Sequence, residues 1–420
     1  MRDLIVLLLV FGSIPFIFYR PYIGVLVWAW LGYMNPHRLT YGFAMDFPFA
    51  QIVAIVTMVA MVISKESKKI LWSREIIVLA IFLVWMLITT LNAQYFDFAW
   101  EQYTKILKIQ IMTFITLMIM GSKDRLILLA WVIAVSIGFF GVKGGYFTIA
   151  TGGAHRVQGP PNTFIGGNNE IGLALIMAIP MMRYLQLLST KWFVKYGLAI
   201  AMFLTAVAIV GTHSRGALVG GAAMVVFLLL KSRKKFVFAL MLAIALPVSV
   251  NFMPDKWFDR MDTIETYAED KSALGRINAW YFAFNVAKDR VTGGGFESFQ
   301  GPMFRIYAPD PYDVHDAHSI YFEVMGEQGF IGLIIFVLLG FFTWQSAQWV
   351  IKNTKGKDDL VWASDLMSMI QVCIVGYSVG GLFLGLAYFD LIYQYIAIVV
   401  IVRAMVTKEL EGAKLKNDFS

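Results

Sequence analysis

Long apolar runs separated by short polar stretches follow one another along most of the chain. A membrane-spanning helix needs about 20 predominantly apolar residues. Eleven runs approach that length, at 47–63, 75–91, 105–120, 126–149, 169–188, 196–212, 216–230, 236–251, 319–345, 366–388 and 390–406. In the stretch 4–34, Pro15 and the Arg20-Pro21 pair either kink one segment or divide it into two. The pattern predicts an all-α polytopic membrane protein with about 12 transmembrane helices.

The composition agrees with this interpretation. Hydrophobic residues make up 59% of the 420 residues, charged residues only 15%, and the mean hydropathy is +0.67. Such values lie outside the range of soluble domains. The chain has one cysteine, Cys373, within an apolar run. We therefore expect neither a disulfide framework nor a thiolate metal cluster within one chain.

Basic residues gather in alternate loops between the apolar runs. The basic loops are 65–74, 123–125, 191–195, 231–235, 352–357 and the tail after 408. The positive-inside rule assigns these loops to the cytoplasm, which accounts for the net charge of +7 without a nucleic-acid partner. The opposite, periplasmic side then receives 35–46, 92–104, 150–168, 213–215 and the long segment 251–318.

The long segment 251–318 is too rich in structural signals to be a simple tether. It contains an aromatic, helix-compatible stretch at 279–284, the glycine run 293–295 and several prolines. We expect one large ordered periplasmic loop that carries part of the active site. The chain would then divide into transmembrane helices at 1–250, this loop at 251–318, and C-terminal helices with a short cytoplasmic tail at 319–420.

Two arginines on the periplasmic side are candidates for binding an anion. Arg215 lies in a turn so short that it must sit at the membrane boundary, and Arg276 lies in the long loop four residues before Trp280. A guanidinium group can hold a phosphate through two parallel hydrogen bonds and stays charged at any working pH. Alternatively, Arg215 extends to lipid phosphates and Arg276 is an ordinary surface residue.

A cluster of histidines and acids lies where the long loop re-enters the membrane. It contains His315, Asp316 and His318, and Glu323 follows in the next apolar run. A histidine at this place can accept a proton near neutral pH, as needed to activate a hydroxyl group. The same three loop residues could instead bind a metal ion, although their spacing matches no strong metal signature.

Two further cations could extend a positively charged surface. Arg156 follows His155 in a Gly/Pro-rich loop, and Lys143 lies within an apolar run. Both are better explained as structural residues. The sequence contains no P-loop, no dinucleotide-binding glycine fingerprint and no Gly-x-Ser-x-Gly nucleophile motif. We therefore expect a substrate that is already activated.

Taken together, these motifs resemble the O-antigen ligase superfamily of polytopic enzymes with a Wzy-C type signature. The resemblance rests on Ser214-Arg215-Gly216, on Arg276 and Trp280 before the glycine run, and on His318-Ser319 followed by Glu323 and the Gly-rich stretch 326–332. The N-terminal stretch 35–43 is similar to the subgroup of exosortase-associated O-glycosylation ligases.

The resemblance implies transfer of a glycan from an undecaprenyl diphosphate carrier to an acceptor hydroxyl, such as that of lipid A-core oligosaccharide. The reaction would invert the anomeric carbon, use no metal or other cofactor, and take place at the periplasmic face of the bacterial inner membrane. His318 would be the general base, and Arg215 and Arg276 would hold the departing diphosphate. Trp280, Glu323, His315, Arg156 and Lys143 would contribute more weakly to substrate binding. The protein would function as a monomer among membrane lipids.

Other functions remain open at the level of sequence. The same site could serve an O-antigen polymerase or a protein O-glycosylating transferase. A secondary transporter or lipid flippase would instead place charged residues near the middle of the bilayer, and Lys105, Lys108 and Lys143 are the residues that could do so.

Overall fold

The computed structural model describes residues 2–66, 68–231 and 271–418, within which all regular structure is helical. The α-helices are α1 (Arg2–Tyr19), α2 (Tyr22–Met34), α3 (Phe49–Ile63), α4 (Arg74–Leu91), α5 (Phe96–Ile119), α6 (Lys123–Ala150), α7 (Asn168–Leu188), α8 (Trp192–Gly211), α9 (Arg215–Lys231), α12 (Lys271–Asp289), α13 (Gly301–Tyr307), α14 (Ile320–Asn353), α15 (Val361–Gly380) and α16 (Asp390–Asp418). Short 3-10 helices are η1 (Pro36–Leu39), η2 (Phe43–Met45) and η3 (Asp358–Leu360). The predicted apolar run 236–251 and the loop residues 252–270 lie outside the described residues.

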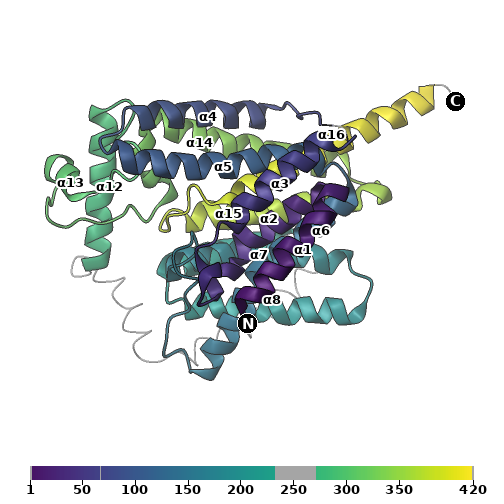
Figure 1. Cartoon of the computed structure of the whole chain (residues 1–420), viewed down its shortest axis with the longest axis horizontal. Helices are drawn as coiled ribbons and strands as arrows, with labels where there is room; N and C mark the ends of the chain where they lie inside the picture. Colours follow the sequence, from purple (N-terminus) through teal and green to yellow (C-terminus); the bar gives the residue numbers. More distant parts are fainter. Residues whose placement is uncertain (1, 67, 232–270, 419–420) are drawn as a thin grey trace.

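Most of the long helices run roughly along one axis, and α12 lies across one end of this bundle (Figure 1). Eight of the described helices are long and apolar enough to cross a membrane, and α2 and α3 are shorter apolar helices. The chain is therefore an all-α polytopic membrane protein, as expected. The number of about 12 transmembrane helices stays a prediction.

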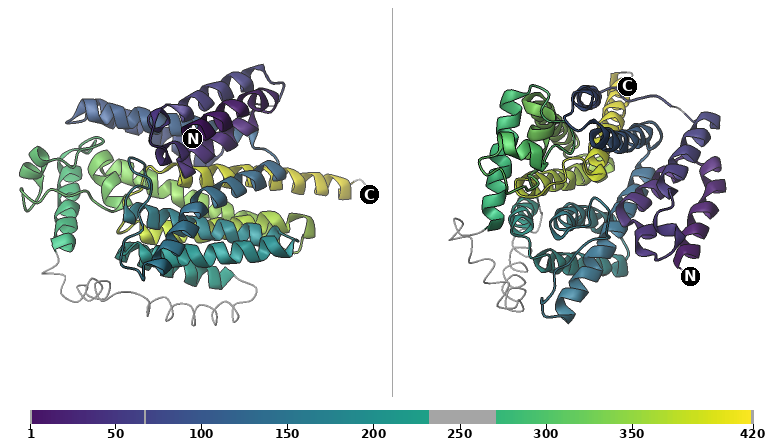
Figure 2. Two further views of the ribbon diagram at one scale, coloured as in Figure 1. Left: turned by 60° about the horizontal axis from the view of Figure 1, so that its bottom comes forward. Right: turned by 60° about the vertical axis from the view of Figure 1, so that its left-hand side comes forward.

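Burial distinguishes the helices at the centre of the bundle from those at its edge. In α7 and α16, 78% of the most apolar window is buried inside the protein, whereas in α1 only 17% is. Helix α7 packs on α6, α8, α9 and α15, while α16 packs on α5 and α14. The N-terminal helices α1 to α3, in purple, lie together on one side of the bundle in both views of Figure 2. The apolar side chains of α1 therefore face lipid.

Two predicted apolar segments differ from the helices that form. The stretch 4–34 divides at Arg20-Pro21 into α1 and α2, because proline lacks the amide hydrogen that would continue the helix. The run 366–388 is not one helix, since α15 ends at Gly380. Residues 381–389 are non-helical and mostly buried, although Leu382 is exposed. This segment, called here the re-entrant segment, is apolar because it packs inside the protein.

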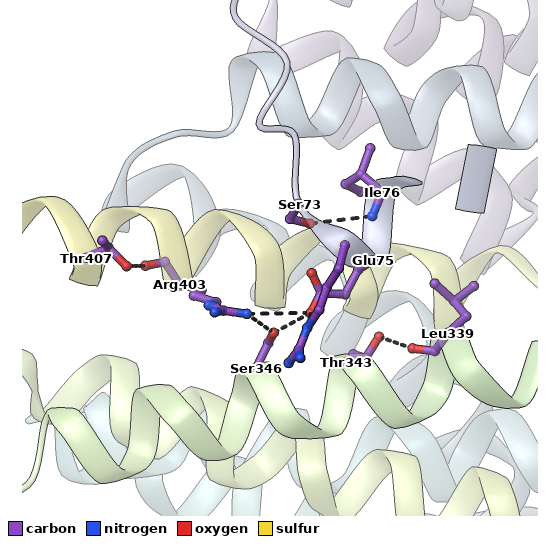
Figure 3. Close-up of polar contacts among 9 residues, drawn as sticks. Ser73, Glu75, Ile76, Leu339, Thr343, Ser346, Arg403 and Thr407 are labelled. Atoms are coloured by element: carbon purple, nitrogen blue, oxygen red, sulfur yellow. Dashed lines mark hydrogen bonds and ion pairs between the residues drawn. The ribbon is translucent and has the colours of Figure 1, made fainter. Parts of the chain in front are cut away.

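A polar network joins three helices at the end of the bundle opposite α12 (Figure 3). Glu75 of α4 is fully buried and accepts hydrogen bonds from Ser346 of α14 and from Arg74. Arg403 of α16 donates to Ser346 at 2.6 Å and lies 3.8 Å from the Glu75 carboxylate. A buried carboxylate needs such partners, so the network fixes α4, α14 and α16 to one another.

Residues 271–318 form an ordered cap with a small core of its own. Helices α12 and α13 share the buried side chains Ala279, Phe282, Val286, Met303 and Phe304. The rings of Phe282 and Phe304 stack at 4.2 Å between centroids. The described part of the predicted long loop is thus folded, and we call it the end cap.

The end cap is joined to α14 where two glycine-rich stretches cross. The amide groups of Gly294 and Gly295 donate to the carbonyl oxygens of Gly326 and Glu327, at 2.8 and 2.9 Å. The amide of Glu297 also donates to Oε1 of Glu327 at 2.9 Å. The glycine run predicted to mark a tight passage therefore lies against the first turns of α14.

Candidate active site

Arg215 is the first residue of α9 and follows a turn that is fixed by several hydrogen bonds. The Ser214 hydroxyl accepts from the amide of Ala217 at 3.2 Å, which caps the helix. Asn168 of α7 donates to the carbonyl of Thr212 at 2.9 Å, and the His213 ring lies 3.0 Å from the carbonyl of Gly153. The half-buried Arg215 therefore projects from a defined backbone position.

Helix α12 carries Arg276 and Trp280 on one face, because residues four apart lie one above the other on a helix. Asn278 of the same helix donates to the carbonyl oxygens of Asp310 and Asp313, each at 2.8 Å. The indole of Trp280 donates to the carbonyl of Ala317 at 2.8 Å. These bonds tie α12 to the loop between α13 and α14, near the end of which His318 lies.

Arg215 and Arg276 line one cavity of about 350 Å³, although they are far apart in the sequence. Its other lining residues are Gly216, Val219, Ala273, Ile277, Trp280 and Phe383. A Cβ atom at Gly216 would lie 2.9 Å from the side chains of Phe383 and Leu384, so the helix start packs closely on the re-entrant segment. We call this space the arginine cavity. It combines two guanidinium groups with apolar and aromatic walls.

His318 is not among the residues that line this cavity, but it lies just before α14 and close enough to Arg276 for that charge to affect its pKa. Its φ of 43° is left-handed, a conformation that costs a non-glycine residue about 1–2 kcal/mol. Hydrogen bonds fix the backbone before and after it. The carbonyl of Ala317 accepts from the Trp280 indole, and the amide of Ile320 donates to the carbonyl of Gly381 at 2.8 Å. The backbone at His318 is therefore fixed between α12 and the re-entrant segment.

The surroundings of His318 favour its neutral form. Burial lowers the pKa of the imidazole below its ordinary value of 6.5, and the positive charge of Arg276 lowers this pKa further. The charge of Asp316 raises the pKa, whereas a charged His315 would lower it. A neutral imidazole at pH 7 can accept a proton.

Several carboxylates surround the same site. Glu323, on the first turn of α14, accepts from the amide of Ala387 in the re-entrant segment at 3.4 Å. Glu170 of α7 interacts electrostatically with Asp316 and Arg276. Burial raises the pKa of Glu297, and the negative charge of Asp316 adds to the rise.

Glu170, Glu297 and Phe383 were not predicted as site residues. Glu170 was detectable in principle, because an acidic residue at the start of an apolar run often has a functional role. Phe383 could not have been found, since its part in the cavity depends on the path of the re-entrant segment.

None of the three weaker cationic candidates lines the arginine cavity. Lys143 is exposed on α6, and Arg156 is exposed in the loop 151–167, where its charge lowers the pKa of His213 beyond the effect of burial. His315 forms an ion pair with Asp313 at 2.8 Å and packs against Gly275 of α12. In the described part of the chain, no three histidine, cysteine, aspartate or glutamate side chains are arranged to hold a metal ion.

Comparison with known protein families agrees with the resemblance expected from the motifs. Residues 200–337 match the family described as O-Antigen ligase. Residues 1–190 match a family of unknown function (DUF5935). No curated protein matches the chain. The first match includes Arg215, Arg276, His318 and Glu323, so the recognition of this superfamily is confirmed.

Proposed function

We propose that the chain, which carries a domain of the O-antigen ligase family at residues 200–337, is a membrane-embedded glycosyltransferase. In this proposal it transfers a glycan from undecaprenyl diphosphate to an acceptor hydroxyl, such as that of lipid A-core oligosaccharide. The reaction takes place at the periplasmic face of the bacterial inner membrane, and the end cap lies on that face.

The observation that carries the proposal is the shared cavity of Arg215 and Arg276. A lipid diphosphate gains negative charge as the glycosidic bond breaks, and this charge must be stabilised close to the membrane. Guanidinium groups bind phosphate oxygens through paired, charge-assisted hydrogen bonds. Two fixed arginines in a cavity with apolar walls are suited to stabilise the charge that develops in the transition state.

His318 acts as the general base in this proposal. The acceptor hydroxyl attacks the anomeric carbon and gives its proton to the neutral imidazole, while the carbon–oxygen bond to the diphosphate breaks and its electron pair stays on the diphosphate. Attack from the face opposite the leaving group inverts the anomeric carbon. The lowered pKa of His318 supports this role, because it keeps the imidazole neutral at pH 7.

Trp280 and Glu323 have supporting roles at the same place. The Trp280 ring stacks on Phe322 at 4.8 Å between centroids and borders the arginine cavity, where an aromatic wall can contact sugar rings. Glu323 bonds to the backbone at Ala387 and so connects the start of α14 to the re-entrant segment. We assign Glu323 to positioning and to glycan binding.

Reconstituted transfer tests the proposal. Purified protein is supplied with labelled undecaprenyl diphosphate glycan, with or without lipid A-core acceptor, and the product mass is measured. We expect His318→Ala to lower turnover by about 10²–10⁴, and Arg215→Ala or Arg276→Ala by about 10²–10³. Arg305→Ala is the matched control, because Arg305 is exposed on α13 in the same end cap.

Each outcome has a distinct meaning. Normal transfer by folded His318→Ala protein removes this residue from the role of base. Normal transfer by both arginine variants refutes diphosphate binding in the arginine cavity. Longer lipid-linked chains formed without the acceptor would assign the site to a polymerase instead of a ligase.

A further inference from the structure

A second, larger cavity of about 600 Å³ lies between the N-terminal helices and α5. One side is formed by α2, η1, η2 and α3, and the other by α5, residues 162–165 and the start of α16. Its lining shares no residue with that of the arginine cavity. Phe389, the last residue of the re-entrant segment, and Asp390 belong to its wall, and the same segment contributes Phe383 to the arginine cavity. One stretch of chain therefore contributes to both cavities.

The lining of this second cavity changes from polar to apolar along α3 and α5. Polar side chains gather near η1, η2 and the loop before α7, and they are Asn35, His37, Arg38, Asp46, Asn162 and Thr163. Further along α3 and α5 the lining is apolar, with Ala54, Ile55, Met58, Ile109, Ile111 and Met112. Met45, Phe47 and Phe164 also line the first part, so the cavity has one end of mixed polarity and one apolar end.

Two lysines lie where the polar and apolar parts meet. Lys105 and Lys108 are one turn apart on α5, both exposed and both bordering the cavity. The Nζ atom of Lys105 lies 4.0 Å from the centroid of the Phe164 ring. Among the described residues, neither ammonium group has a carboxylate within ion-pair distance. Like charges at this spacing repel each other, and a bound anion would relieve that repulsion.

The remaining charges of the lining are one ion pair and one buried carboxylate. Arg38 and Asp46 form an ion pair at 2.7 Å and balance each other. Asp390, only 6% exposed, is then the one carboxylate among the described lining residues that faces the two lysines. Its Oδ1 has no hydrogen-bond partner in the described part of the chain. The lining itself therefore holds two lysines against one aspartate, while Glu297 and Glu101, outside the lining, also act electrostatically on Lys105.

We propose that this second cavity binds a membrane lipid whose head group carries a phosphodiester and free hydroxyl groups. Lys105 and Lys108 hold the phosphate, the polar end receives the hydroxyl groups, and an acyl chain lies along the apolar part of α3 and α5. Helix α3 packs on α1 and α2, whereas α5 packs mainly on α16 and α4. A lipid can therefore enter between two helices that are anchored to different neighbours.

Lipid binding by the full-length protein tests this inference directly. Purified protein in detergent is titrated with phosphatidylglycerol or with zwitterionic phosphatidylcholine, and bound lipid is counted by native mass spectrometry. We expect phosphatidylglycerol to bind at least about 10-fold more tightly than phosphatidylcholine. A tenfold difference in affinity is about 1.4 kcal/mol. The double variant Lys105→Gln/Lys108→Gln should lose this preference.

The controls separate this site from general effects of charge and folding. Lys352→Gln/Lys355→Gln removes two exposed lysines elsewhere and should leave the preference unchanged. Met58→Trp, which fills the apolar end, should weaken binding of phosphatidylglycerol while both lysines remain. Equal binding of phosphatidylglycerol by the Lys105/Lys108 variant and the wild type would overturn the proposal.

Soluble glycerophosphoglycerol, which keeps the phosphodiester and the hydroxyl groups but has no acyl chains, tests whether the ligand is a lipid. If it displaces phosphatidylglycerol at equal concentration, the apolar part of the cavity contributes nothing and the lipid assignment is refuted. These measurements need no glycan donor, so their result does not depend on the proposed transferase activity.

Discussion

The crossing of the end cap and α14 leads to a sharp prediction for Gly293→Ala. Gly293 has a φ of +66°, and a Cβ atom there would lie 2.6 Å from the amide nitrogen of Gly329 and 2.7 Å from the carbonyl oxygen of Glu327. Both contacts are with backbone, so no side chain can rotate away. The substitution should separate the end cap from α14.

The expected cost can be built from two contributions. A non-glycine residue in the left-handed region costs about 1–2 kcal/mol, and forcing a methyl group into a filled space costs about 1–3 kcal/mol. The sum is about 2–5 kcal/mol. Because each 1.4 kcal/mol is about a factor of ten, the open form of the crossing should become at least about 30-fold more populated.

Hydrogen exchange of two amides measures this opening. Gly294 and Gly295 donate to carbonyl oxygens of α14 in the closed form, so their exchange rates report separation of the crossing. The matched control is Gly301→Ala at the start of α13. The nearest atom to a Cβ there is 3.9 Å away, and we expect less than about a threefold change because the contact is ordinary.

Two results would refute this reasoning. If Gly293→Ala and Gly301→Ala show the same exchange at these amides, the close backbone crossing does not hold the end cap. If Gly293→Ala accelerates exchange but glycan transfer stays normal, the end cap is not required to position Arg276.

Three further predictions concern the base, its backbone support and the network at the other end of the bundle. The transfer rate should fall as the pH drops through the pKa of His318, which lies below 6.5, because the protonated imidazole cannot act as a base. Arg276→Gln removes a positive charge, so the pKa of His318 rises. The fall in rate at acid pH should then begin at a higher pH. Trp280→Phe removes the hydrogen bond to Ala317, worth about 1 kcal/mol, and should slow transfer about fivefold without changing donor affinity; a larger loss of affinity than of turnover would contradict this. Glu75→Ala leaves the partly exposed Arg403 without its buried carboxylate and should destabilise the protein by about 2–4 kcal/mol; an unchanged Tm would show that the network in Figure 3 does not stabilise the bundle.

Hydropathy located the spanning helices because lipid imposes a minimum length on an apolar helix. The predicted run 75–91 corresponds to α4, Arg74–Leu91, almost residue for residue. The start of α5 was placed too late, at 105 instead of Phe96. Glu101, Lys105 and Lys108 interrupt the apolar pattern there, yet they are compatible with a helix, so hydropathy alone could not find the true start.

The re-entrant segment shows where the same reasoning fails. Residues 381–389 are as apolar as a spanning helix, but most of them are buried in the protein. The amide of Ile320 in α14 donates to the carbonyl of Gly381, and the Tyr377 hydroxyl in α15 donates to the carbonyl of Leu386. Hydropathy cannot distinguish burial in lipid from burial in protein. The arginines and His318 were predicted from motif chemistry, whereas the cavity that the two arginines share also depends on Phe383 of this segment.

Binding of undecaprenyl diphosphate tests the central claim, that Arg215 and Arg276 hold one diphosphate, most directly. The affinity of the wild type, Arg215→Ala, Arg276→Ala and the double variant is measured for this lipid and for undecaprenyl monophosphate. Each single variant should bind the diphosphate about 10- to 100-fold more weakly, since a hydrogen bond to a charged group contributes about 1.5–3 kcal/mol. The double variant should no longer distinguish diphosphate from monophosphate. Wild-type affinity for the diphosphate in both single variants would contradict the claim.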